Sequence, residues 1–548
     1  MREFSLMSTV ALALLAVVAA GVESASSFTC ASNLPYNPNN ASSYRVSNLP
    51  KLTASAAQAL QNGQYAGYIP ISSDPSDPEN MFFWFFPSAQ PTSQDLVIWL
   101  NGGPGCSSLF GSFIENGPVT ILADGTVDSS PNSWHQYANV LYVEQPLGAG
   151  YSDNTNVKSG PKSEFDVGSQ FLVFLNGFYA AFPQTRSWSL YLTGESYAGV
   201  YIPFIAGAIQ TCPGVPEPIP FKGIALNDAI LSFPAQIGPR STVAAFDYLH
   251  LAGYFQRTDP SGALEHAAAQ LADMCRGETR HDPRCDLVML IRGWYEATYP
   301  GGDACLDYYN IRGTVPCDKS GQYWREEARL KAYLNSPSVR QAMHVDPWLA
   351  NQNASYQWGE CNDISITIPG DAQSGPNSET FLPGLVASGV KVILYNGDQD
   401  LLVNYVSVEE VLGNLTWNGA TGFQTSPQRW IVDDGEAGIE WQARGLTYIR
   451  VFGSGHMVAA NKPQAGIAVL QRLLGAGATT RPSASIAMTP AYISPPVASV
   501  KTEVGSLVIE AKAAATMSEA MTSIKSFGAS HRASIFMLLT TLFFIVWA

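Results

Sequence analysis

The sequence predicts an α/β protein in which a central, mostly parallel sheet is flanked by helices. Short, almost continuously apolar runs alternate with longer segments of helical periodicity, and such runs are what a strand buried on both faces requires. This alternation predicts a sheet that is covered by helices. The candidate strands lie at 96–100, 140–143, 190–193, 392–395 and 448–452, and the clearest candidate helices at 165–182 and 199–210.

Two further segments differ from this pattern. Residues from about 232 to 345 hold four cysteines and no strong strand candidates, so we expect an inserted cap subdomain within a folded domain of residues 28–475. Residues 476–530 are rich in Ser, Thr, Pro and Ala, a composition that buries little apolar surface and is typical of an extended stalk.

Both ends of the chain carry the marks of export. Residues 1–20 form a short apolar run after Arg2, as in a secretory signal peptide, with cleavage expected between residues 20 and 25. Residues 531–548 end in an apolar tail preceded by small residues, a pattern similar to a GPI-attachment signal. A retained membrane segment and a soluble product are the alternatives to this lipid anchor at the membrane.

Composition excludes several classes of protein. The hydrophobic fraction of 46% is too high for a wholly disordered chain, and the formal charge of −15 with no long basic run argues against nucleic acid as a partner. Eight cysteines suit an oxidising compartment, and their spacing matches no common zinc site, so no metal is expected. Asn40, Asn353 and Asn414 begin N-x-S/T sequences and are candidate glycosylation sites.

A candidate nucleophile lies in the segment Leu-Tyr-Leu-Thr-Gly-Glu-Ser-Tyr-Ala-Gly at 190–199. A buried strand ends at Gly194, Ser196 follows, and a helix begins directly afterwards. Small neighbours permit the strained turn that raises a serine hydroxyl above a sheet, although this G-x-S-x-A pattern differs from the usual G-x-S-x-G. Ser196 is therefore a candidate catalytic serine.

Partners for such a serine follow in the expected order. In a sheet of this kind an acid and then a histidine come after later strands, because the serine needs a base and the base needs an orienting carboxylate. Asp398 and Asp400 follow the strand at 392–395, and His456 follows the strand at 448–452. Spacing alone does not decide between the two aspartates.

A glycine-rich turn follows the first strong strand, in the sequence Asn101-Gly-Gly-Pro-Gly-Cys106. Its glycines can present bare backbone N–H groups to an oxyanion. No Gly-Lys-Ser/Thr ends the run, which excludes a phosphate-binding loop of the Walker type.

These motifs together resemble the serine carboxypeptidases of the α/β-hydrolase fold, over residues from about 60 to 475. The resemblance is carried by four separated segments in the family's order and by a fifth, Val143 to Ser152, similar to the family's [DE]-x-P-x-G-x-G-[FY]-S. The four are Trp99–Ser108, Gly194–Gly199, Gly397–Asp400 and Gly455–Met457. Secreted fungal members with C-terminal anchor signals are the most similar group.

The resemblance implies a role for each matching residue. Ser196 would be the nucleophile, His456 the base and Asp400 the orienting acid, with the N–H groups of Gly103 and Tyr197 as the oxyanion hole. The free carboxylate of the substrate would be held by Trp99, Asn101, Glu115 and Glu195, with Met457 lining the substrate pocket. No metal or organic cofactor is implied.

The two glutamates constrain the chemistry further. A substrate carboxylate cannot favourably meet two ionised carboxylates, so Glu115 and Glu195 should share a proton when substrate is bound. We therefore expect tighter binding of peptides, and higher kcat/KM, on the acid side of neutrality.

The family also implies a disulfide between Cys106 and Cys361. The pairing among Cys275, Cys285, Cys305 and Cys317 is open between nested and sequential schemes, and Cys30 with Cys212 then follows by elimination. One segment, residues 225–229 (Ala-Leu-Asn-Asp-Ala), departs from the family's usual Gly-Asn-Gly. We expect this departure to affect the pocket and to leave the Ser, His and Asp residues untouched.

The resulting expectation is a secreted, cell-surface serine carboxypeptidase that releases single residues from the C-termini of peptides and proteins through an acyl-enzyme. An acyltransferase or esterase on the same three residues is one alternative, and a non-catalytic surface protein is another.

Overall fold

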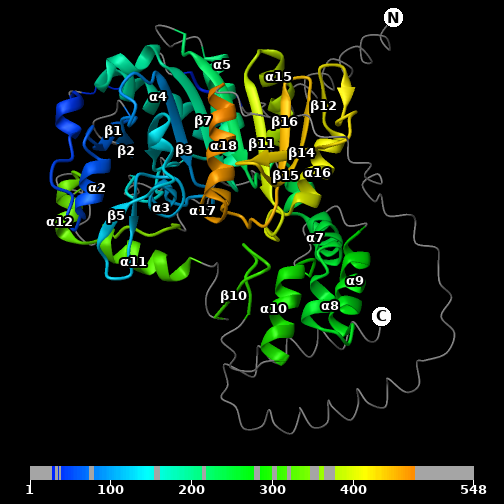
Figure 1. Cartoon of the computed structure of the whole chain (residues 1–548). Helices are drawn as coiled ribbons and strands as arrows, with labels where there is room; N and C mark the ends of the chain where they lie inside the picture. Colours follow the sequence, from blue (N-terminus) through cyan, green and yellow to red (C-terminus); the bar gives the residue numbers. More distant parts are fainter. Residues whose placement is uncertain are drawn as a thin grey trace, which may run out of the picture. The chain divides into compact units, whose positions relative to one another are not determined.

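A ten-stranded mixed sheet organises the chain in the computed structural model (Figure 1). The structure describes residues 27–30, 35, 37, 39–72, 79–152, 161–212, 218–276, 284–298, 305–316, 323–345, 357–362 and 377–475. In spatial order the strands are β1 (Tyr65–Pro70), β2 (Asn80–Phe86), β6 (Asn139–Val143), β3 (Asp95–Leu100), β7 (Ser189–Glu195), β8 (Phe221–Asn227), β11 (Lys391–Gly397), β16 (Leu446–Val451), β15 (Gly435–Ala443) and β14 (Gln428–Val432).

The middle of the sheet is parallel and its two margins are antiparallel. Strands β6, β3, β7, β8, β11 and β16 pair in parallel, whereas β1 and β2 extend one margin and β15 and β14 extend the other in antiparallel pairing. The prediction of a mostly parallel sheet is confirmed. All five candidate strands from the sequence belong to its parallel centre, as β3, β6, β7, β11 and β16.

Each face of the sheet is covered by helices because the central strands are apolar on both sides. Along β3, Leu96 and Ile98 pack into one apolar cluster and Val97 and Trp99 into another, as the alternation of side chains along a strand requires. The first cluster includes residues of α4 (Glu164–Ala181), α5 (Ala198–Thr211), α15 (Leu382–Ala387) and α16 (Tyr405–Asn414). The second includes residues of α3 (Ser108–Ile114), α11 (Trp324–Leu334), α12 (Pro337–Ala342) and α18 (Pro463–Leu474).

Shorter elements complete the part of the domain outside the cap segment. They are η1 (Ala41–Tyr44), α2 (Ala54–Ala59), β4 (Val119–Ile121), β5 (Val127–Ser129), η2 (Trp134–Gln136), η3 (Pro183–Ser187), η5 (Ser378–Phe381), β12 (Thr416–Trp417), β13 (Ala420–Thr421) and α17 (Val458–Asn461).

The segment expected to form a cap is mainly helical and has an apolar cluster of its own. Its elements up to residue 315 are α6 (Phe233–Gln236), α7 (Pro239–Leu251), α8 (Tyr254–Thr258), α9 (Ala263–Cys275), α10 (Leu287–Thr298), β9 (Cys305–Leu306) and β10 (Thr314–Val315). The last part of the expected segment differs, because α11 and α12 pack into the second cluster on the sheet. Helices α7 to α10 group together in Figure 1. Leu249, Phe255, Leu264 and Ile291, one from each of these helices, belong to the cap's own apolar cluster. The hydroxyl of Tyr248 on α7 donates to the carbonyl of Asp398 at 3.1 Å, which ties the cap to the loop after β11.

Disulfides connect distant parts of the fold. The bonds are Cys30–Cys212, Cys106–Cys361 and Cys275–Cys285, and Cys305 is also disulfide-bonded. The bond between Cys275 and Cys285 is the one that a sequential scheme contains and a fully nested scheme lacks.

Several sequence predictions fall outside the described residues. These are the leader at 1–20, the stalk at 476–530, the apolar tail at 531–548, Cys317 and Asn353. Among the residues that the structure describes, no helix combines the length and apolarity needed to cross a bilayer.

Candidate active site

Ser196 occupies a sharp turn between β7 and α5. Its φ of 62° lies in the left-handed region, which is uncommon for a residue other than glycine and is held only where the surroundings fix it. Here the Ser196 N–H donates to the carbonyl of Asn227 at 2.9 Å, and its carbonyl accepts from the N–H groups of Gly199 and Ile230 at 3.0 Å each. The turn leaves Ser196 partly exposed, although Glu195 and Tyr197 on either side are buried.

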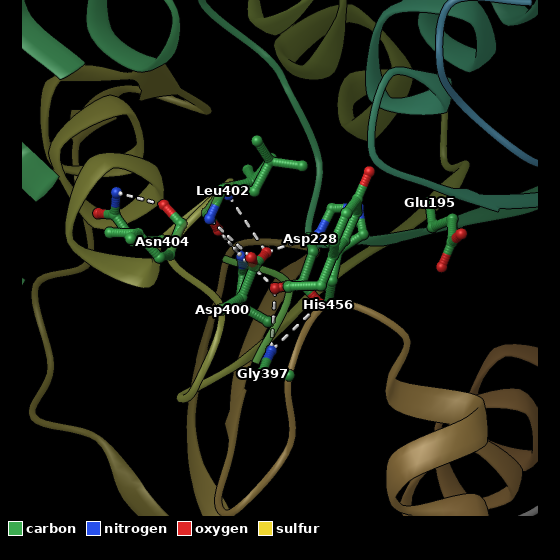
Figure 2. A network of polar contacts seen from close by, with 12 residues as sticks. Glu195, Asp228, Gly397, Asp400, Leu402, Asn404 and His456 are labelled. Atoms are coloured by element: carbon green, nitrogen blue, oxygen red, sulfur yellow. Dashed lines mark hydrogen bonds and ion pairs between the residues drawn. The ribbon is translucent and has the colours of Figure 1, made fainter. Parts of the chain in front are cut away.

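His456 and Asp400 form a buried pair (Figure 2). His456 Nδ1 lies 2.6 Å from Asp400 Oδ2, and the two residues are 2% and 0% exposed. The Asp400 carboxylate also accepts from the backbone N–H groups of Leu402 at 2.8 Å and Val403 at 3.2 Å. These bonds fix the acid, and Nε2 is the ring atom of His456 that remains for a second partner.

Asp398 lies in a different environment. Its Oδ1 accepts from the backbone N–H of Gly453 and from Gln399 Nε2, both at 2.7 Å. Of the two aspartates that spacing left open, Asp400 is therefore the one bonded to the histidine.

The main chain of His456 is held from two sides. Its N–H donates to the carbonyl of Tyr309 at 2.8 Å, and the Tyr309 ring meets the imidazole edge-to-face with ring centres 5.2 Å apart. Its carbonyl accepts from Asn227 Nδ2 at 2.8 Å. Since the carbonyl of Asn227 also binds the Ser196 N–H, Asn227 bridges the serine turn and the histidine loop.

The glycine-rich loop after β3 packs directly onto the serine turn. A Cβ atom on Gly102 would lie 2.4 Å from the Tyr197 nitrogen and 2.8 Å from Ser196 Cβ, so only glycine allows this approach. Gly103 has a φ of 110°, which also requires glycine. The backbone of residues 102–103 is thereby placed next to the Tyr197 N–H at the start of α5.

A buried carboxyl group anchors the far side of this loop. Glu144 accepts from Ser107 Oγ at 2.7 Å and from the Ser108 N–H at 3.0 Å. Trp358 Nε1 donates to Ser107 Oγ at 2.9 Å, and the Cys106–Cys361 bond joins the same two segments. Burial raises the pKa of Glu144 to about 7.

The four residues expected at the substrate carboxylate lie together. Trp99 Nε1 donates to Asn101 Oδ1 at 2.9 Å, and Asn101 Nδ2 donates to Glu195 Oε1 at 2.9 Å and to Glu115 Oε1 at 3.2 Å. All four side chains are buried. Asn101 therefore joins residues from the ends of β3, α3 and β7 into one cluster.

Both glutamates of this cluster accept from the same amide group, Asn101 Nδ2, which places their carboxyl groups close together. Two buried carboxyl groups this close favour sharing a proton, because only a protonated carboxyl can donate to the other. Burial raises the pKa of Glu115 to about 7. Burial and, after it, the charge of Glu115 raise the pKa of Glu195 well above its ordinary value.

Comparison with known families identifies this arrangement. The family described as serine carboxypeptidase matches residues 51–476, which is most of the chain. The chain belongs to the serine carboxypeptidase family.

Curated relatives and a solved structure agree with this membership. The chain is 32% identical over 457 residues to the pheromone-processing carboxypeptidase kex1 of Penicillium rubens, a match that spans 80% of this chain and 71% of the relative. The kex1 protein of Aspergillus niger is 32% identical over 79% of this chain and 70% of its own length. The crystal structure of Kex1, a prohormone-processing carboxypeptidase of Saccharomyces cerevisiae, matches with a TM-score of 0.68 and 27% identity over 80% of this chain and 96% of that chain. The protein is thus a serine-type carboxypeptidase with the α/β-hydrolase fold.

The predicted pocket residue Met457 and two of the candidate glycosylation sites also lie among the described residues of this carboxypeptidase. Met457 is buried beside His456 and packs into the second apolar cluster. Asn40 and Asn414 are exposed, Asn40 at the start of η1 and Asn414 at the end of α16. Both surface asparagines are sterically open to a glycan.

Sequence reasoning missed two residues of the site. Asn227 ends the unpredicted strand β8 and Asp228 follows it. Asn227 Nδ2 donates to the carbonyl of His456, and Asp228 accepts from the Gly397 N–H at the start of the loop that carries Asp400. The departure at 225–229 therefore reaches the His456–Asp400 pair, contrary to the expectation that it affects the pocket alone. A polar Asn-Asp pair after an apolar stretch was the available signal.

The buried carboxyl groups of this carboxypeptidase make its stability depend on pH. Burial raises the pKa of Glu115 and Glu144 to about 7 and that of Glu360 to about 8. The folded state then binds more protons than the unfolded state above the ordinary glutamate pKa of 4.5, so the free energy of unfolding falls as pH rises from about 5 to about 8. Buried His135, whose pKa is lowered by burial, opposes this trend as a single group at the acid end.

We therefore predict that the Tm measured by calorimetry is higher at pH 5.5 than at pH 8. The variant Glu144→Gln keeps the size of the side chain and removes one of the titrating protons, so its Tm should change less steeply over the same range. A Tm that rises steadily from pH 5.5 to pH 8 would contradict the assignment of protons to these buried groups.

Proposed function

We propose that Ser196 is the nucleophile of this carboxypeptidase, that His456 is its general base and that Asp400 orients the imidazole. The observation that carries the proposal is the buried His456–Asp400 bond of 2.6 Å, whose histidine loop is joined through Asn227 to Ser196 in its left-handed turn. The base accepts the Ser196 proton through Nε2 as the oxygen attacks the last peptide bond of the substrate. It then donates that proton to the leaving amino acid, and water releases the remaining peptide from the acyl-enzyme.

In this mechanism the oxyanion accepts hydrogen bonds from the backbone N–H groups of Gly103 and Tyr197. Two features support the assignment: the close approach of the Gly102–Gly103 backbone to Tyr197, and the position of Tyr197 at the start of the 14-residue helix α5. Donors at a helix N-terminus carry partial positive charge, which stabilises a developing anion without reorganisation.

Recognition of the substrate terminus would rest on Glu115 and Glu195 in their protonated pair. A neutral or singly charged pair can donate hydrogen bonds to a carboxylate, whereas a doubly ionised pair repels it. The raised pKa values of both groups support binding that is strongest at acid pH and that weakens as the pH rises through about 7. A mid-chain peptide bond offers no such charge, so single C-terminal residues are released.

We predict that an N-blocked dipeptide is cleaved with a kcat/KM about 100-fold higher than its C-terminal amide at pH 5, since the amide forfeits charged hydrogen bonds. The ratio should fall between pH 6 and pH 8, and Glu195→Gln should flatten this dependence. The measurement is initial rates by mass spectrometry over that pH range.

Ser196→Ala is the control for these rates and should lower kcat by about 10⁴-fold or more. The same substitution should abolish labelling by a fluorophosphonate. Equal rates for the dipeptide and its amide at every pH would contradict the role proposed for the glutamates, and undiminished labelling of Ser196→Ala would contradict the nucleophile.

We further propose that the enzyme is exported and held at the cell surface by a GPI anchor, where it trims secreted peptides. The leader at 1–20, the stalk at 476–530 and the tail at 531–548 support this location, as do the disulfides and the exposed asparagines Asn40 and Asn414. The names of the relatives, which describe processing of pheromones and prohormones, support peptides as substrates.

For the anchor we predict that phosphatidylinositol-specific phospholipase C releases the carboxypeptidase from intact cells that produce it. A version that ends at residue 530 should appear in the medium without treatment. Activity that stays with the membrane after the lipase and yields only to detergent would instead indicate a retained membrane segment.

A further inference from the structure

A second buried aspartate lies against the His456–Asp400 pair. Asp228 is fully buried directly after β8, and donor or acceptor atoms of Asp228, Asp400 and His456 all lie within 4.8 Å of one another. Figure 2 shows the three side chains gathered beside Gly397. The established activity and the mechanism proposed above assign no role to this residue.

The backbone around Asp228 fixes its carboxyl group. Asp228 has a φ of 41°, and its N–H donates to the carbonyl of Tyr395 at 2.8 Å. Its Oδ1 accepts from Asn396 Nδ2 and from the Gly397 N–H, each at 3.0 Å. The carboxyl is therefore aimed at the end of β11, where the loop carrying Asp400 begins.

Carboxyl oxygens of Asp228 and Asp400 lie within 4.8 Å of each other, and two buried carboxyl groups this close favour one shared proton. Asp400 already accepts from two backbone N–H groups and from His456 Nδ1, all of which stabilise its ionised form. Asp228 accepts only from a neutral amide, Asn396 Nδ2, and from one backbone N–H, that of Gly397, which contacts both of its oxygens. It has no imidazole partner like that of Asp400, so a shared proton belongs on Asp228.

The surroundings of Asp228 favour the same distribution. The ionisable groups that face it are Asp400 after β11, Glu195 at the end of β7, His456 after β16, and the hydroxyls of Tyr248, Tyr395 and Tyr448. Burial, followed by the charge of Asp400, raises the pKa of Asp228 well above its ordinary value.

We propose that Asp228 is a positioning residue of the carboxypeptidase, whose protonated carboxyl donates a hydrogen bond to Asp400 and thereby weakens the hold of Asp400 on the imidazolium form of His456. This inference rests on the roles proposed above for Asp400 and His456. A donor on Asp400 draws negative charge away from the Nδ1–H of His456, so the imidazolium form of the ring is less stabilised.

Two conformationally matched variants test the proposal. Glycine and asparagine are the residues best suited to a positive φ, so Asp228→Gly and Asp228→Asn should both fold. The asparagine keeps a donor toward Asp400 and the glycine removes it. The substrate should be an N-blocked amino acid p-nitrophenyl ester, because it lacks the free carboxylate and so reports on the serine chemistry without the glutamate pair.

For Asp228→Gly we expect the acidic limb of the kcat/KM profile to lie about one pH unit higher than that of the wild type. This shift corresponds to a tenfold loss of kcat/KM at low pH. The plateau value of kcat/KM should stay within about threefold of the wild type. Asp228→Asn should keep the wild-type limb. If kcat/KM of Asp228→Gly falls equally at every pH and its acidic limb is unchanged, Asp228 has only a structural role and the proposal is wrong. Loss of wild-type activity on dialysis against EDTA would also overturn it, because a cation would then take the place of the proton.

A second measurement does not depend on the glycine variant. Infrared difference spectroscopy between the wild type and Asp228→Asn at pH 6 should show the band of a protonated carboxyl in the wild type, and a carboxylate band in its place would contradict the proposal. If the wild type neither cleaves the ester nor reacts with a fluorophosphonate, the proposed nucleophile fails. If the wild type is active and the acidic limb of the Asp228→Gly profile coincides with that of the wild type, only the role proposed for Asp228 fails.

Discussion

The constraint on which this site depends is the burial of several carboxyl groups at one edge of a parallel sheet. The carboxyl ends of β3, β7, β8 and β11 bring Glu195, Asp228 and Asp400 into a buried region where Glu115 also lies. Isolated buried charges are costly, so carboxyl groups in such a place must be paired, hydrogen-bonded or protonated. Here burial raises the pKa of Glu115, Glu195 and Asp228, so the proposed sharing of one proton within each of the pairs Glu115–Glu195 and Asp228–Asp400 would make proton binding part of the fold.

The same edge of the sheet decides where the reacting groups lie. Each of them follows a strand directly, so the register of the sheet sets their positions within a few residues. Close packing adds two contacts between the loops. The glycine loop can approach the serine turn because Gly102 has no side chain. Asn227 hydrogen-bonds both the serine turn and the histidine loop. The catalytic geometry is thus a product of backbone contacts more than of long side chains.

Much of this arrangement could be predicted from the sequence, and the limits have physical causes. The parallel centre of the sheet was predictable because its strands are apolar on both faces, whereas β8 escaped because Lys222 and Gly223 interrupt its apolar run. The motif residues Ser196 and His456 stood out because each follows a strong strand. The choice of Asp400 over Asp398 came from family resemblance, since both follow the same strand. Asp228 was missed because its contact with Asp400 joins chain segments 172 residues apart, a proximity that only the folded sheet creates.

The central claim, that a protonated glutamate pair receives the substrate carboxylate, is tested most directly by counting protons on binding. Titration calorimetry of a peptide into Ser196→Ala, in buffers of different ionisation enthalpy, gives the number of protons taken up. The account predicts uptake of up to one proton per peptide at pH 8, where Glu115 of the free enzyme, with a pKa of about 7, is largely deprotonated, and close to none at pH 5. Binding without proton uptake at pH 8, with an affinity equal to that at pH 5, would contradict it.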